Sequence, residues 1–72
     1  MSKITQKDIR LGKQIKKFRN KVALTQEQLA NRVKISTTHL GLVETGKRRI
    51  SLKTLQKIAS VFGMKVRDIL PF

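Results

Sequence analysis

The feature that most constrains the fold is a four-residue connection, Val-Lys-Ile-Ser at residues 33–36, between two short amphipathic helices. Before it, Thr25 followed three residues later by Gln28 is the pattern of a helix-capping box. After it, Ser36 is suited to cap the next helix, and Gly46 is suited to end that helix in the left-handed conformation. So short a connection forces the two helix axes to cross steeply.

Helical signals also fill the rest of the chain. Thr5 with Asp8 marks the start of a first helix, Ser51 and Gly63 bracket a fourth, and a last turn and a half is expected at residues 66–70. Tyrosine and tryptophan are missing, and no segment alternates apolar with polar residues over the length of a strand. The sequence therefore predicts an all-α, compact five-helix fold.

Apolar residues recur at three-to-four spacing, which gives each expected helix an inward face. A chain this short has room for one domain, residues 1–72, with one simple core. Val22, Leu52 and Ala59 continue the apolar stripes of the first and fourth helices and are expected to face inward. The predicted core consists of Leu11, Ile15, Phe18, Leu29, Ala30, Val33, Leu40, Val43, Leu55, Ile58 and Phe62.

Charge is the strongest signal in the composition, because 17 Lys and Arg residues face only 4 Asp and Glu, a net charge of +13. Such an excess repels itself in the folded state unless a polyanion neutralises it, and nucleic acid is the first candidate. The run Lys47, Arg48 and Arg49 directly after the third helix is expected to clamp phosphates. The outer side of the first helix is expected to be solvated, or to steer DNA at long range, through Lys7, Lys13, Lys16, Lys17 and Lys21.

The third helix carries unusually short side chains on its outer side. Thr37, Thr38, Gly41 and Leu42 could approach base edges in a major groove without crowding them. Thr can form a hydrogen bond to a base or a phosphate, and its methyl group, like Leu42, can meet the methyl group of thymine. His39 is expected to face solvent or phosphate rather than bases.

The ordered motifs LGKQIKKFR, TQEQLA, S…L..VE.GKR and ISLKTLQKIASVFG resemble the phage-repressor (Cro/XRE) class of helix-turn-helix DNA-binding domains, over residues 11–70. The resemblance implies a lambda-repressor-like domain with its helix-turn-helix at about residues 25–46. It also implies a sequence-specific regulator of transcription, usually a repressor, that docks the helix at residues 37–45 in the major groove of double-stranded DNA.

Site residues follow from the same resemblance, position by position. Glu44 matches the inward carboxylate of the family and is expected to pair with Arg19, since a lone buried charge would be costly. Gln26 corresponds to a residue that touches phosphate and braces the reading helix. Base reading is implied for Thr37, Thr38, Gly41 and Leu42, and phosphate binding for Gln26, Ser36, His39, Lys47, Arg48 and Arg49.

Three positions depart from the family pattern. Lys34 stands where the turn usually has Gly, so a residue with a Cβ is expected in the left-handed conformation, at a cost of about 1 kcal/mol. Gly41 weakens the reading helix by about 1 kcal/mol relative to Ala, which fits either a close approach to the duplex or sequence drift. Lys65 replaces the usual cap of the last helix, whose end is therefore expected to fray.

Other function classes find little support in the sequence. No cysteine and a single His39 leave no metal site, and neither a cofactor nor a small-molecule ligand is expected. Paired carboxylates and a Gly-rich phosphate loop are missing, so we expect no enzyme. No apolar run approaches a membrane span or a signal peptide, and a cytoplasmic protein of a prokaryote, phage or plasmid is expected.

The expected assembly is a homodimer on a pseudo-palindromic operator, because one reading helix covers only a few base pairs. The fourth helix and the apolar tail DILPF, residues 68–72, are the expected dimer contact. An antitoxin or a transcriptional adaptor that uses the same fold to hold another protein is the alternative. Its partner would need apolar surface to bind, and only Ile4, Leu70 and Phe72 are left over from the core.

Overall fold

The computed structural model describes residues 3–72, and in that range it contains five α-helices and no strand. This confirms the expected all-α architecture. The helices are α1 (Gln6–Lys21), α2 (Gln26–Val33), α3 (Thr37–Glu44), α4 (Leu52–Phe62) and α5 (Val66–Ile69).

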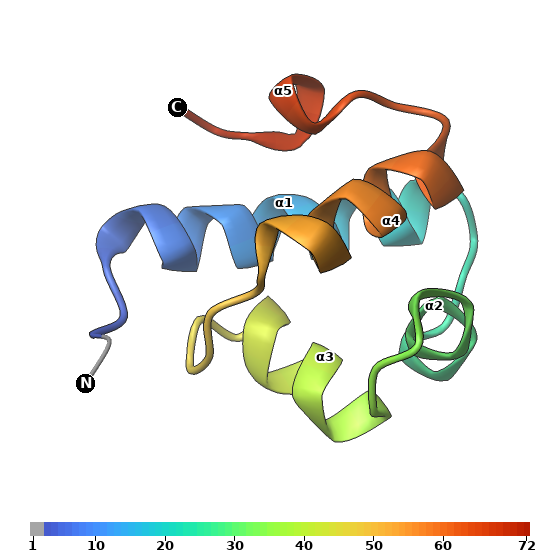
Figure 1. The fold of residues 1–72 in the computed structure, drawn as a ribbon, viewed down its shortest axis with the longest axis horizontal. Coiled ribbons are helices and arrows are strands. Elements are labelled where there is room, and N and C mark those ends of the chain that lie inside the picture. Colours follow the sequence, from blue (N-terminus) through green and yellow to red (C-terminus); the bar gives the residue numbers. More distant parts are fainter. Residues whose placement is uncertain (1–2) are drawn as a thin grey trace.

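Helix α1 runs through the middle of the molecule and the shorter helices surround it (Figure 1). α3 packs against α1 on one side and α2 on the other, while α4 packs against α2. α5 closes the opposite end over α1 and α4. The side of α3 that is turned away from α1 therefore forms one end of the molecule (Figure 1).

Side-chain caps fix the start of the four longer helices. Thr5 and Thr25 each form a reciprocal capping box with the residue three positions on. The hydroxyls of Ser36 and Ser51 accept the backbone N–H of the third helical residue. All four starts are where the sequence predicts them.

The buried core contains every predicted member except Phe18, which is half-buried at its edge. The ring of Phe18 lies 6.5 Å from that of Phe62. Two further residues are buried, Ala59 from α4 and Ile69 from α5, so the last helix also contributes to the core.

Two inward predictions are wrong. Val22 is 41% exposed and Leu52 is 63% exposed. Val22 is the residue after the last turn of α1, and Leu52 is the first residue of α4. The helical period places both on the apolar stripe, but at the ends of their helices the stripe extends beyond the neighbouring helices.

The turn between α2 and α3 has the expected backbone. Lys34 adopts the left-handed conformation with φ 64° and ψ 40°, and the N–H of Ile35 then donates to the carbonyl of Ala30 at 3.1 Å. This turn reverses the chain within three residues of the end of α2 and sets the crossing of α3 over it. At α5, the side chain of Lys65 makes no cap, and its N–H donates instead to the Asp68 carboxylate at 3.3 Å.

Candidate nucleic-acid interface

Helix α3 presents its short side chains on the face opposite the core. Leu40 and Val43 are buried, whereas Thr38 and Thr45 are exposed and Leu42 is half-buried. Residues four and seven positions apart lie one above the other on a helix, so Thr38, Leu42 and Thr45 form one outward line. Of the other predicted base-reading residues, Thr37 is exposed at the start of the helix and Gly41 is half-buried.

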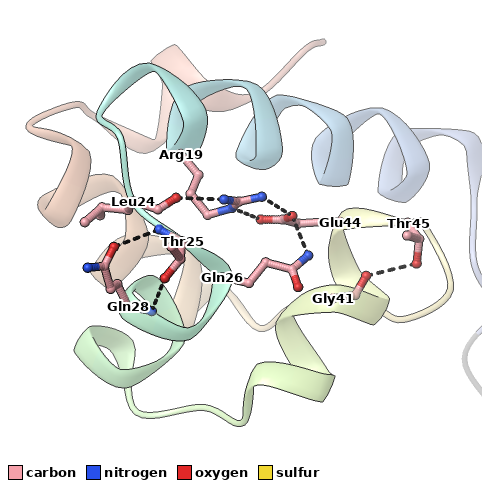
Figure 2. Close-up of polar contacts among 8 residues, drawn as sticks. All are labelled: Arg19, Leu24, Thr25, Gln26, Gln28, Gly41, Glu44 and Thr45. Atoms are coloured by element: carbon pink, nitrogen blue, oxygen red, sulfur yellow. Dashed lines mark hydrogen bonds and ion pairs between the residues drawn. The ribbon is translucent and has the colours of Figure 1, made fainter.

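Sequence reasoning missed Thr45, which extends the outward line to the end of α3. Its hydroxyl donates to the carbonyl of Gly41 at 2.9 Å (Figure 2). It also lies 3.2 Å from the carbonyl of Leu42, and these contacts cap the last turn. The signal was available, because Thr45 stands seven residues after Thr38, which is two helical turns.

A buried ion pair ties the C-terminal end of α3 to α1. Arg19 donates from Nε to Glu44 Oε2 at 2.7 Å and from Nη2 to Glu44 Oε1 at 3.0 Å (Figure 2). Its remaining Nη1 donates to the carbonyl of Leu24 at 2.7 Å. The Glu44 side chain is 0% exposed and that of Arg19 is 9% exposed. The predicted pair is therefore present, and it is bidentate and shielded from water.

Gln26 adds a third donor to this carboxylate. From the first turn of α2, its amide nitrogen donates to Glu44 Oε1 at 2.9 Å (Figure 2). Its amide oxygen borders Gly41, where an added Cβ would lie 3.5 Å away. Gln26 thus braces the reading helix, as the resemblance implies, and the first N–H groups of α2 remain without partners inside the helix.

Close backbone packing also holds α3 in place. A Cβ at Gly12 in α1 would collide with the carbonyl oxygen of Val43 in α3. The two helices can approach this closely only because position 12 has no side chain. Together with the Arg19–Glu44 pair, this contact holds the C-terminal turn of α3 against α1.

The cationic run after α3 is anchored by its backbone while its side chains stay exposed. Gly46 is left-handed at φ 75°, and the N–H of Lys47 donates to the carbonyl of Leu42 at 2.8 Å. Lys47, Arg48 and Arg49 are all exposed. Arg49 Nε lies 3.6 Å from Asp8 Oδ2, an ion pair that the sequence did not predict.

The charge of Asp8 is stabilised where it meets Arg49. The backbone N–H of Thr5 is the largest influence that lowers the pKa of Asp8 below its ordinary value of 3.8, and burial, the second largest, opposes it. The Thr5 hydroxyl and then the Arg49 guanidinium lower the pKa further. Asp8 therefore stays ionised at neutral pH, both as a helix cap and as a partner of the cationic run.

The remaining phosphate candidates lie around the outward face of α3. Ser36 caps the start of the helix and accepts the N–H of His39 at 3.0 Å. The side chain of His39 is half-buried, on the first turn of α3. Ser36 and His39 are thus at one end of the reading helix, Lys47 begins the run at the other end, and Gln26 lies beside the middle.

Within residues 3–72 the structure contains no pocket and no cluster of three or more His, Cys, Asp or Glu side chains that could hold a metal ion. None of the helices in that range is both long enough and apolar enough to cross a membrane.

α2 and α3 cross at a tight turn, and α3 is held against α1 while it exposes short side chains. This arrangement defines a helix-turn-helix protein. The helix-turn-helix family model matches residues 15–69, and the chain belongs to that family.

Relatives and solved structures agree with this assignment. An uncharacterised HTH-type transcriptional regulator of Archaeoglobus fulgidus is 47% identical over 58 residues, which cover 81% of this chain and 82% of the relative. The control protein C.MunI of a Mycoplasma species is 36% identical over 62 residues, covering 85% and 84%. The crystal structure of the restriction-modification controller protein C.AhdI from Aeromonas hydrophila superposes with a TM-score of 0.80 at 28% identity, covering 85% of this chain and 92% of that one.

Proposed function

We propose that this protein is a sequence-specific regulator of transcription, a repressor that reads double-stranded DNA with α3. The observation that carries the proposal is the outward line of Thr38, Leu42 and Thr45 on a helix fixed from behind by Glu44. A helix held in one position can present its side chains to base edges without losing further conformational entropy. Membership of the helix-turn-helix family and relatives named as transcriptional regulators support the same function.

Base reading is assigned to the outward side of α3. The hydroxyls of Thr37 and Thr38 reach bases or phosphates, and the Thr38 methyl group and Leu42 pack on thymine methyl groups. Gly41 has no side chain to obstruct the groove wall. These contacts discriminate between sequences, and each good one contributes about 1–3 kcal/mol of preference at its base pair.

Phosphate binding is assigned to both ends of α3 and to the start of α2. Gln26 stands at the N-terminus of α2, where its backbone N–H has no partner within the helix, and Ser36 and His39 lie at the start of α3. Lys47, Arg48 and Arg49 neutralise the backbone beyond its end. In this proposal none of these groups makes or breaks a covalent bond, and the protein acts by occupying its DNA site. The site lies in the cytoplasm of a prokaryote, on its chromosome or on a phage or plasmid.

The decisive experiment is a binding-site selection from randomised duplexes at two salt concentrations. Thr38→Ala should change the preferred sequence by about 1–3 kcal/mol at individual base pairs and leave the salt slope intact. Lys47→Gln should weaken every sequence alike and reduce the slope by about 0.9 per phosphate lost. Ser60→Ala, an exposed hydroxyl removed from α4, is the control and should change neither. A wild-type protein without any sequence preference would rule out the regulator and leave a nonspecific DNA coat or a protein-binding module.

We also propose that the active form is a homodimer with reading helices about 34 Å apart on a pseudo-palindrome. Leu52 of α4 and Phe72 of the tail are 63% and 56% exposed, which makes them the best available apolar contacts. Leu52→Ser with Phe72→Ser should abolish the dimer in sedimentation experiments and shrink the footprint to one half-site. Val22→Ser removes an apolar residue that is 41% exposed elsewhere and should leave the dimer intact. If the Val22→Ser control also dissociated into monomers, or if a monomer protected the full operator, this assembly would be refuted.

A further inference from the structure

Five of the 17 basic residues form a row along α1 that the proposed reading of DNA does not use. We call this row the α1 cationic face. Every member is exposed, and helical spacing places all of them away from the buried Ile15. The row spans about 21 Å of helix at 1.5 Å per residue. Its members are Lys7, Arg10, Lys13, Lys17 and Lys21.

The α1 cationic face points away from the reading helix. α1 contacts α3 through Gly12 and Arg19, which lie on the other side of the helix from the row. The outward line of α3 lies on the opposite side of that helix from the buried Leu40 and Val43, which face the core. A duplex bound by α3 therefore leaves the part of the α1 cationic face at Lys13, Lys17 and Lys21 uncovered.

No acidic side chain neutralises this face in residues 3–72. The ion pairs in that range are Arg19–Glu44 and Arg49–Asp8, and neither includes a member of the row. Asp8, the one acid of α1, is occupied by Thr5 and Arg49. Like charges four residues apart, as at Lys13, Lys17 and Lys21, destabilise a helix. An external polyanion would remove this repulsion.

Aromatic rings hold several of the ammonium groups close to the protein surface. Lys17 and Lys21 Nζ lie 5.7 and 5.5 Å from the centroid of the Phe18 ring. Lys7 Nζ lies 5.2 Å from the Phe72 ring. Cation–π contacts of this kind restrict the side chains, so less entropy is lost when they bind a ligand.

We infer that the α1 cationic face binds the sugar–phosphate backbone of a second DNA duplex, without sequence preference, so that one molecule joins two duplexes. The inference rests on the proposed function of α3 for the first duplex. A band of cations along one side of a helix matches a rod that carries one negative charge per about 1.7 Å. The two rings beside the row already carry lysine ammonium groups, Lys17 and Lys21 over Phe18 and Lys7 over Phe72, which disfavours stacking of single-stranded bases on them. The row also lacks apolar members for insertion into a lipid surface, and no pocket for a small polyphosphate was found in the described residues.

The test measures capture of a second duplex by the complex. Protein is bound to its selected site on an immobilised duplex, and a labelled duplex without that site is added in solution. The face variant is Lys13→Gln, Lys17→Gln and Lys21→Gln, and the control is Lys57→Gln, Lys65→Gln and Arg67→Gln. Each removes three exposed positive charges, from +13 to +10, and keeps side chains of helix-compatible length.

The face variant should lose about tenfold in capture, and the salt slope of capture should fall by about 2.7, which is 0.9 for each of three phosphates. Its binding of the single selected site should stay within about twofold of wild type, and its thermal midpoint should not fall, because repulsion along α1 is removed. The control should retain capture. An equal loss by both variants would show that overall charge and not this face is responsible, and would overturn the inference.

Two further outcomes separate the possible failures. Polyglutamate and unlabelled duplex are compared as competitors at equal total charge. If polyglutamate displaces the labelled duplex equally well, the face is a site for an acidic protein and the inference is wrong. If the wild type selects no preferred site, the proposed function fails by itself. The same variants are then compared for binding of random duplex, where a loss confined to the face variant still supports the α1 cationic face.

Discussion

At the scale of single residues, Glu44 is the point where three elements meet. Its carboxylate accepts hydrogen bonds from Arg19 of α1 and Gln26 of α2, and it stands in the last turn of the reading helix. The pair is almost completely shielded from water, so the two charges depend on each other. The residue that fixes the reading helix is therefore also a sensitive point for stability.

Glu44→Ala should lower the free energy of unfolding by about 3–5 kcal/mol, because Arg19 is left buried without its partner. Urea denaturation followed by circular dichroism measures this loss. The double variant Arg19→Met with Glu44→Leu replaces the pair by apolar groups and should be more stable than Glu44→Ala alone. An unchanged denaturation midpoint for Glu44→Ala would mean that the Arg19–Glu44 pair makes no net contribution to the free energy of unfolding.

The Asp8 carboxylate should make stability depend on pH in the acid range. Its pKa in the folded state is lowered from 3.8, chiefly by the Thr5 backbone N–H, so its contribution is fully present above pH 3.8. The contribution is lost as the pH falls through the lowered pKa. Asp8→Asn should therefore be less stable than wild type at neutral pH, and the difference should shrink at lower pH. Glu27→Gln removes an exposed acid and is the control. A stability difference between Asp8→Asn and wild type that stayed constant down to strongly acid pH would contradict this assignment.

At the scale of elements, the sequence was most informative where the determinant is local. Thr5, Thr25, Ser36 and Ser51 predicted four helix starts because a cap needs only the next three residues. Lys34 was predicted to be left-handed because the resemblance places it at the turn position that is usually Gly. These features follow from positions that are neighbours in the chain.

Predictions that depend on distant neighbours were less complete. Val22 and Leu52 fit the helical period, but whether a helix end is covered depends on where other helices stop. The family resemblance supplied the pairing of Glu44 with Arg19. No pattern in the sequence indicated the contact between Asp8 and Arg49, which lie far apart in the chain. Positions far apart in the chain meet only after α1, α3 and the loop between α3 and α4 have packed together.

Two glycines in helices should respond in opposite ways to the same substitution. Gly12→Ala should be destabilising, because its Cβ would collide with the Val43 carbonyl and push α3 away from α1. Gly41→Ala should stabilise the protein by up to about 1 kcal/mol through helix propensity. Its Cβ would make only an ordinary contact, 3.5 Å from the Gln26 amide oxygen.

Thermal melting compares the two variants, and DNA binding then decides why position 41 is Gly. A stabilised Gly41→Ala with weaker operator binding would mean that the duplex approaches this backbone closely. Unchanged binding would indicate drift. If Gly12→Ala melted at the same temperature as wild type, the close packing of α1 on α3 would not be needed for stability.

At the scale of the whole molecule, the charge distribution is the dominant fact. A net charge of +13 is spread over a body that measures 31 × 24 × 19 Å, so many cations lie within one or two Debye lengths of each other. Lys47, Arg48 and Arg49 directly follow α3, and the α1 cationic face places others on another side. The fold therefore tolerates repulsion that a bound polyanion would relieve.

The free protein should accordingly become more stable as sodium chloride is raised from about 0.02 to 0.3 M, over which the Debye length falls from roughly 20 to 6 Å. Each 1 kcal/mol gained raises the midpoint of a domain this small by about 4–8 °C. The buried Arg19–Glu44 pair is poorly accessible to salt, so its attraction should change little over this range. The variant Lys13→Gln, Lys17→Gln and Lys21→Gln should start from a higher midpoint at low salt and gain less from added salt than wild type. Scanning calorimetry at matched protein concentration measures both curves. A midpoint that falls with salt would show that surface attractions outweigh the repulsion, and would remove the physical reason for expecting polyanions to stabilise this fold.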